Sequence, residues 1–237
     1  MEKLKRRIPV IPLRGLTVLP TMVLHFDVSR DKSIRAIEAA MENDQMLFLT
    51  AQRDPEENNP GITGVYEIGM NTKIRNVQKL PKDLVRVTAE GMQKARLLEM
   101  EEQDGFLLAK VELIEEQVPE LNAISKEAMV RALWELLKRY AQLNHKFSKD
   151  MLRQLLEIRE LEKLTMAVSV QLPLYYTERQ ELLEADGLVE RYNVLSALMV
   201  KEMEVLQIRN DIQMKVKERV DKHQKEYLLR EQLKDYR

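Results

Sequence analysis

The sequence predicts an α+β protein, with a β-rich first part followed by an α-helical second part. Six of the seven glycines and six of the eight prolines precede residue 119, which is typical of short strands joined by turns. After this point apolar residues recur at spacings of three and four, the pattern of amphipathic helices. We therefore predict a β-rich domain over residues 1–118, a helical bundle over 119–187 and one long helix over 188–237.

Seven segments of the first part have the composition and patterning of strands. Val85 and Val87, for example, alternate with Arg86 and Thr88, which predicts a sheet with one buried face. The predicted strands span residues 8–13, 22–28, 46–51, 72–78, 84–90, 95–101 and 107–115.

One helix interrupts the predicted strands. Residues 31–43 place Ile34, Ile37 and Met41 on one helical face, and Asp31 is suited to cap the first turn. Residues 52–61, which follow the third strand, are acidic, rich in proline and asparagine, and without an apolar anchor. We predict a mobile surface loop there.

Four helices are predicted in the second part, over residues 124–143, 151–156, 161–172 and 175–186. Pro173 ends the third of them and Gly187 the fourth. Several methionines fall on helical stripes, which favours core packing, although an adaptable methionine-lined groove is the alternative. These methionines are Met41, Met129, Met166 and Met199.

The last 50 residues contain neither glycine nor proline. A continuous helix of this length would be about 75 Å long, and its apolar stripe is sparse. The stripe consists of Val205, Ile208, Ile212, Val216, Val220 and Tyr227. We expect the helix to protrude and to meet another surface. Because the pattern has no C-terminal stop signal, we also expect the natural protein to continue.

Composition narrows the functional class. The net charge is −1, so no overall field attracts nucleic acid or an anionic membrane. The chain has no cysteine, which excludes disulfides and thiolate metal sites and suits a reducing compartment. No apolar run has the length of a signal peptide or a membrane span. We predict a soluble, cytoplasmic protein.

Motifs for catalysis are absent from the sequence. His25, His145 and His223 are far apart and lack metal-ligand spacing, so we expect one strand, one loop and one helix-surface histidine. No phosphate-binding loop or nucleophile elbow occurs. Adjacent glutamates, such as Glu101 and Glu102, are expected to be solvated charges. We predict no catalytic residue, no metal site and no cofactor in this chain.

The strongest candidate for binding is the apolar segment from Leu16 to Leu24. Pro20 has no N–H to donate, so it belongs at a strand edge or in a loop. Two interpretations stay open: a partly exposed patch that binds other proteins, or a buried crossover. The candidate binding residues are Val18, Leu19, Pro20, Met22 and Leu24.

Several motifs resemble the N-terminal region of the Lon-type ATP-dependent proteases. They are IPVIPLRG at residues 8–15, LPTMVL at 19–24, DKSI at 31–34, LVRV at 84–87, EGMQKAR at 90–96, LPL at 172–174, RQELLE at 179–184 and QKEYLLREQLK at 224–234. Residues 81–83 and 235–237 depart from the family pattern.

The resemblance implies a PUA-like β-domain, a helical bundle and a long helix, without catalytic residues. In the family, an ATPase module and a Ser–Lys protease module follow this region. ATP and Mg²⁺ would bind only in the ATPase module. It also implies a cytoplasmic hexamer that degrades misfolded proteins. The function expected of this chain is capture of exposed hydrophobic segments of unfolded proteins, in protein quality control.

Other functions compete with substrate capture. The terminal helix also suits an oligomerisation or spacer module that supports hexamer assembly. Nucleic-acid binding, common among PUA-like folds, is disfavoured by the balanced charge and the lack of an aromatic and basic cluster. An enzymatic role for the fragment itself is the least supported.

Overall fold

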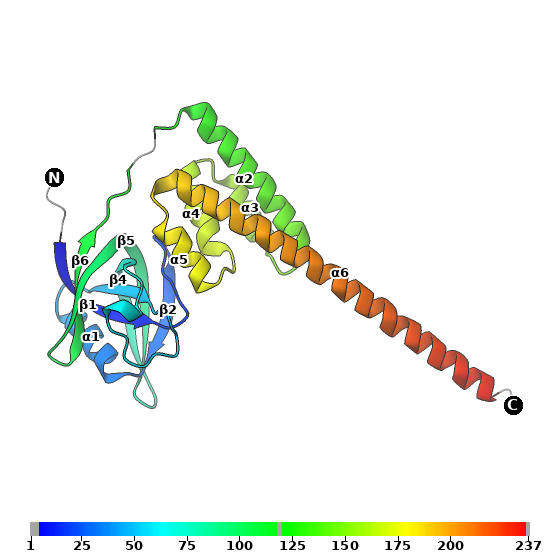
Figure 1. Cartoon of the computed structure of the whole chain (residues 1–237), viewed down its shortest axis with the longest axis horizontal. Helices are drawn as coiled ribbons and strands as arrows, with labels where there is room; N and C mark the ends of the chain where they lie inside the picture. The colour runs from blue at the N-terminus through cyan, green and yellow to red at the C-terminus, as the bar shows by residue number, and fades with distance from the viewer. Residues whose placement is uncertain (1–4, 118–119, 236–237) are drawn as a thin grey trace.

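The computed structural model describes residues 5–117 and 120–235 and confirms the α+β class (Figure 1). A closed β-rich head, residues 5–113, is followed by a helical bundle, residues 123–210, from which the last helix projects. The predicted boundary between residues 118 and 119 lies outside the described residues, as do residues 236–237 of the predicted helix. The division into three domains stays a prediction.

The head contains six strands in one sheet with the order β2-β5-β4-β3-β1-β6. Because β5 also pairs with β6, the sheet closes on itself. β1 runs parallel to β3, and the other pairs are antiparallel. The strands are β1 (Lys5–Leu13), β2 (Val23–Val28), β3 (Met46–Ala51), β4 (Ile68–Leu80), β5 (Leu84–Gln103) and β6 (Phe106–Leu113), with a short 3-10 helix at Ile62–Gly64.

The two strands predicted at residues 84–90 and 95–101 are one strand, β5. Its first half pairs with β2 and β4, and its second half pairs with β6. The register against β4 shifts between the two halves, where Thr72 faces Gly91 and Asn71 faces Gln93. Met92 is therefore the extra residue of a β-bulge, a feature that bends a strand without ending it. The bulge explains why the pattern suggested two strands.

Helix α1 (Asp31–Glu42) packs against β1 and β6. The residue at its N-cap is Arg30, and no side chain caps the first turn, so the capping role predicted for Asp31 is wrong. Ile37 is buried with Ala36 and Ala40, but Met41 is 40% exposed. The face toward the sheet is centred on the two alanines, and Met41 lies outside it.

The loop at residues 52–61 folds back onto the head, contrary to the expectation that it lacks an anchor. The buried amide of Gln52 donates to the backbone oxygens of Asp54 and Glu57, at 3.0 and 2.9 Å. Pro60 is also buried. These contacts fix both ends of the loop against the sheet.

The bundle and the long helix follow the predicted order. Asn122 caps the first helix by accepting from the backbone N–H of Ser125 at 2.8 Å. Of the methionines predicted to pack in the core, Met199 is buried and Met129 and Met166 are partly buried. The helices are α2 (Ala123–Leu143), α3 (Lys149–Glu157), α4 (Leu161–Gln171), α5 (Tyr176–Glu184) and α6 (Gly187–Asp235).

The first half of α6 packs against α2, α4 and α5, whereas its second half projects from the molecule (Figure 1). Leu206 is the last buried residue, and residues 211–232 are all exposed. The predicted stripe from Val205 to Tyr227 is between 47% and 65% exposed, which confirms the predicted protrusion. Among the described helices, none is long and apolar enough to cross a membrane.

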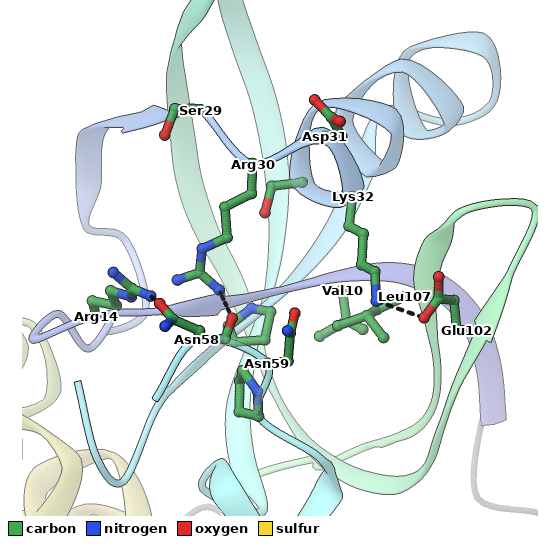
Figure 2. A pocket seen from close by; sticks show the side chains of 13 residues that line it. Val10, Arg14, Ser29, Arg30, Asp31, Lys32, Asn58, Asn59, Glu102 and Leu107 are labelled. Atoms are coloured by element: carbon green, nitrogen blue, oxygen red, sulfur yellow. Dashed lines mark hydrogen bonds and ion pairs between the residues drawn. The ribbon is translucent and has the colours of Figure 1, made fainter. Parts of the chain in front are cut away.

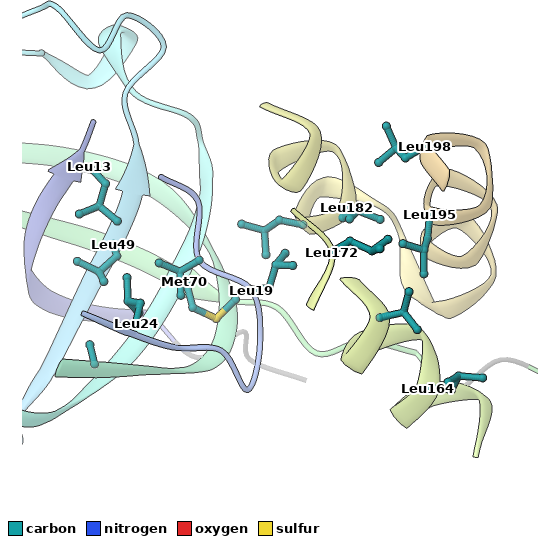
Figure 3. Packing of buried hydrophobic residues seen from close by; sticks show 14 of the residues in the cluster. Leu13, Leu19, Leu24, Leu49, Met70, Leu164, Leu172, Leu182, Leu195 and Leu198 are labelled. Carbon is teal, nitrogen blue, oxygen red and sulfur yellow. The ribbon is translucent and has the colours of Figure 1, made fainter. Parts of the chain in front are cut away.

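Head and bundle share one hydrophobic core. Leu19 at the edge of the head lies on the side that faces Leu172 and Leu182 of the bundle, and all three belong to one buried cluster (Figure 3). Two polar links accompany it. Thr17 donates from its hydroxyl to the backbone oxygen of Tyr176 at 2.8 Å, and Gln180 donates to the backbone oxygen of Ile68 at 2.8 Å. The two parts are therefore one packed unit.

A charge cluster with two buried cations completes this contact. Lys94 of β5 donates to the backbone oxygen of Ala185 at 2.9 Å and lies 3.9 Å from the Glu116 carboxylate. Arg191 of α6 forms a two-pronged ion pair with Glu116. Burial alone would raise the pKa of Glu116, but the hydrogen bond and charge of Arg191, together with Lys94, lower it overall. Both cations are nearly inaccessible, so the carboxylate balances charge that water does not reach.

Replacing Glu116 with glutamine should destabilise the fold by about 2 kcal/mol at pH 7, because Arg191 would remain buried without its counter-charge. Water reaches the Glu116 side chain, which is about one-third exposed, and this limits the penalty. A carboxyl group whose pKa is lower in the folded state stabilises the fold at pH values above its unfolded pKa. This stabilisation is lost as the pH falls through the folded-state pKa. The loss should therefore shrink below pH 4.5, the ordinary value.

Urea unfolding of Glu116→Gln at several pH values measures this effect, with Glu115→Gln as the control on the exposed neighbour. Equal midpoints for Glu116→Gln and the unsubstituted chain at pH 7 would contradict the assigned role of the cluster.

Candidate functional site

The three histidines lie where the sequence predicted. His25 is on β2, where its ring lies 2.9 Å from the Thr88 hydroxyl. His145 is in the loop after α2, and His223 is exposed on α6. Residues 5–117 and 120–235 contain no group of three or more His, Asp or Glu side chains arranged to hold a metal ion.

The predicted binding segment is mostly buried. Val18, Leu19 and Leu24 are at most 4% exposed, so the expectation that they contribute to an exposed patch is wrong. They face the core shared by head and bundle, which is the physical reason for their burial. Pro20 and Met22 are half-buried and remain reachable. Of the two interpretations of this segment, the structure supports the buried crossover for all but its turn.

The crossover ends in a tight turn from Leu19 to Met22. The backbone N–H of Met22 donates to the oxygen of Leu19 at 3.2 Å, and Thr21 has a φ of 65°. Proline at the second position and a positive φ at the third are the marks of a type II turn. A β-branched residue seldom adopts this conformation, so Thr21 stores local strain.

Gly91 of β5 holds this turn in place. The backbone N–H of Thr21 donates to the oxygen of Gly91, and that of Gly91 donates to the oxygen of Met22, both at 2.9 Å. A Cβ at Gly91 would lie 2.3 Å from the Leu19 oxygen. Only glycine permits so close a backbone approach. The turn is therefore fixed to the strand directly beside the bulge at Met92.

Turn and bulge together present an apolar surface, which we call the turn patch: Pro20, Met22, Val23 and Met92. Val23 is 56% exposed and Met92 48% exposed. Val23 pairs with Glu90, and the Glu90 carboxylate lies 2.6 Å from an Arg75 nitrogen, so the adjacent charge is balanced. The patch is small, apolar and rigidly supported, which suits binding to apolar side chains.

The sequence carried a signal for half of this patch. The apolar turn identified Pro20 and Met22, whereas Val23 and Met92 were missed. In the sequence, Met92 has the pattern of an ordinary strand residue. The only sign of a bulge is the glycine before it. Its closeness to the turn depends on pairing between β2 and β5, which are far apart in sequence.

Residues 7–201 match the family described as the substrate-binding domain of the ATP-dependent protease La (LON). The Lon protease of Lachnoclostridium phytofermentans is 39% identical over 99% of this chain and 29% of its own length. Lon protease 1 of Bacillus subtilis is 37% identical over 98% and 30%, and the Escherichia coli Lon protease 34% identical over 96% and 29%. The chain thus spans about 30% of the length of these relatives.

Two solved structures have the same fold. The N-terminal domain of a Mycobacterium avium complex Lon protease superposes with a TM-score of 0.64 at 20% identity, covering 82% of this chain and 98% of that one. The Lon N-terminal domain protein from Xanthomonas campestris gives a TM-score of 0.55 at 15% identity, with the same coverage.

Replacing Gly91 with alanine should destabilise the protein by about 3 kcal/mol, because the new Cβ would displace the Leu19 backbone and the packed turn. Gly61→Ala is the matched control: no atom lies within 4 Å of its added Cβ, and its φ of −79° suits alanine. Thermal and urea unfolding of both variants measure the difference. Equal stability of the two variants would show that the turn is not held as described.

Proposed function

The chain belongs to the N-terminal substrate-binding domains of the Lon proteases, and from that premise we propose that it captures exposed hydrophobic segments of unfolded or damaged proteins through the turn patch. The observation that carries the proposal is the cluster of accessible apolar side chains, Met22, Val23 and Met92, on a backbone fixed by Gly91. Unfolded polypeptides display apolar segments that native proteins bury, so such a surface distinguishes between them.

The energetics favour weak, reversible capture by one copy. Burying about 300 Å² of apolar area contributes roughly 7 kcal/mol before the cost of ordering the client, which offsets much of it. Several copies held together, as in the hexamer that we propose for the parent protease, would raise the effective concentration and so the avidity. Weak binding at each copy also allows a client to dissociate from the turn patch.

We assign no chemistry to this chain. The relatives that it matches are ATP-dependent proteases of about three times its length, and it corresponds to their N-terminal domain. ATP hydrolysis and peptide cleavage would belong to the rest of such a protein. In that setting the chain would serve protein quality control by presenting clients in the cytoplasm.

A second function is favoured by the exposed stripe of α6, whose accessible apolar residues include Ile208, Ile212 and Val216. Such a stripe on a projecting helix suits an assembly module. Deleting residues 211–237 distinguishes between the two functions. Client capture requires that the shortened chain still bind unfolded protein, whereas an assembly role alone requires only that it lose self-association in light scattering.

We predict that Met92→Glu weakens binding of an unfolded client about fivefold or more, because a charge would replace an apolar contact of the patch. The control is Ile124→Glu, which alters an 81% exposed side chain at the start of α2, outside the patch. Fluorescence anisotropy with a labelled, reduced and carboxymethylated protein measures the binding, with the native protein as competitor. Equal affinity for native and unfolded protein, or an unchanged affinity in Met92→Glu, would refute the proposal.

A further inference from the structure

A second cavity, separate in its residues from the turn patch, lies where the end of β1, the start of α1 and the loop at residues 52–61 meet (Figure 2). Its volume is about 660 Å³, within the range of ligand sites. Arg14 and Arg30 reach into it beside Asn58. We call it the arginine cavity.

Both guanidinium groups are bound only by neutral oxygens of the described residues. Arg14 donates from Nη2 to the Asn58 side-chain oxygen at 2.9 Å and to the Glu57 backbone oxygen at 3.4 Å. Arg30 donates to the Asn58 backbone oxygen at 3.1 Å and to the Gln52 side chain at 3.2 Å. Among these bonds none uses Nη1 or Nε of Arg14, so donors remain for a ligand.

The fold holds these two like charges together. Gln52 is fully buried, and its amide group fixes the loop while its oxygen receives Arg30. Asn58 receives both arginines. Partial burial lowers the pKa of Arg30, and the charge of Arg14 lowers it further, which shows that the two cations repel each other. Such an arrangement costs free energy until an anion occupies it.

Carboxylates near the cavity do not contact either arginine. Glu102 pairs with Lys32 at 2.6 Å. The Glu57 carboxylate lies against Gly64, where a Cβ would be 2.5 Å from its oxygen. Asp31 points away from both arginines (Figure 2). Within residues 5–117 and 120–235, no carboxylate forms an ion pair with Arg14 or Arg30.

We propose that the arginine cavity binds a carboxylate of an extended polypeptide client, from the chain terminus or an acidic side chain. Guanidinium groups match a planar carboxylate with paired hydrogen bonds. Val10, Pro12, Pro60 and Leu107 supply apolar walls for an adjoining aliphatic side chain. The inference deepens the proposed function and rests on it.

The test titrates the full chain with a short neutral peptide in three forms: a free C-terminal acid, a C-terminal amide, and an amide with one internal aspartate. NMR shifts of the arginine side-chain N–H groups report binding. At least one carboxylate form should bind about tenfold more tightly than the neutral amide. A preference for the free acid assigns the chain terminus, and a preference for the aspartate form assigns the side chain. Equal affinity of all three forms overturns the proposal.

Variants separate this site from the turn patch. Arg14→Gln should remove the preference for a carboxylate without unfolding the chain, because Arg14 is exposed. Arg153→Gln, on the exposed surface of α3, is the control and should keep it. Asn58→Asp places a carboxylate between the arginines, so it should raise the melting temperature and abolish peptide binding. Retained carboxylate preference in Arg14→Gln or Asn58→Asp would overturn the proposal.

Two further comparisons test for other anions and distinguish failure of the arginine cavity from failure of the turn patch. Inorganic phosphate that displaces the acid peptide supports anion recognition by the arginines, whereas phosphate binding without binding of any carboxylate peptide overturns the assignment. If unfolded clients bind through Met92 while no carboxylate form is preferred, this inference fails and the proposed function stands. If a carboxylate is preferred while Met92→Glu has no effect on unfolded clients, the turn patch fails and the cavity stands.

Discussion

The close approach of the Leu19–Met22 turn to Gly91 is the constraint on which the rest of the structure depends. Two backbone hydrogen bonds join the turn to β5, and the absence of a side chain at Gly91 makes them possible. Fixing the turn places Val18 and Leu19 in the core shared with the bundle. It also leaves Val23 exposed and Met22 half-buried, beside the bulge that exposes Met92. The contact between the turn and Gly91 thus determines which apolar residues of this region are buried and which are exposed.

The contact between head and bundle is maintained by both apolar and charged groups. Leucines of the bundle pack against the crossover, and the Lys94–Glu116–Arg191 cluster crosses from β5 to α6. Burying charge is costly unless it is balanced, so we infer that the cluster favours the one relative orientation of the two parts in which Glu116 meets both cations. The orientation in turn sets the direction in which the exposed half of α6 projects (Figure 1). The interface between head and bundle therefore fixes where the turn patch lies relative to the projecting half of α6.

Local pattern was enough to predict the α+β class, the helix positions and the projecting end of α6. It was not enough where contacts between residues far apart in the sequence determine burial, strand continuity or a cavity. The apolar run at residues 16–24 left an exposed patch and a buried crossover both open, because nothing in the sequence shows that a helical bundle covers Leu19. The bulge at Met92 looked like a break between strands, since only pairing with β4 reveals an extra residue. The arginine cavity was not predicted, because Arg14, Arg30 and Asn58 meet only through long-range folding.

Native-state hydrogen exchange at the turn tests the central claim most directly. If the turn is fixed to β5 and head and bundle share one core, the amides of Thr21 and Gly91 should exchange with nearly the same opening free energy as buried amides of α5, because all open in one cooperative step. Exchange of Thr21 as fast as the exposed residues 211–232 of α6 would contradict the account. So would opening free energies for head and bundle that differ by more than about 2 kcal/mol.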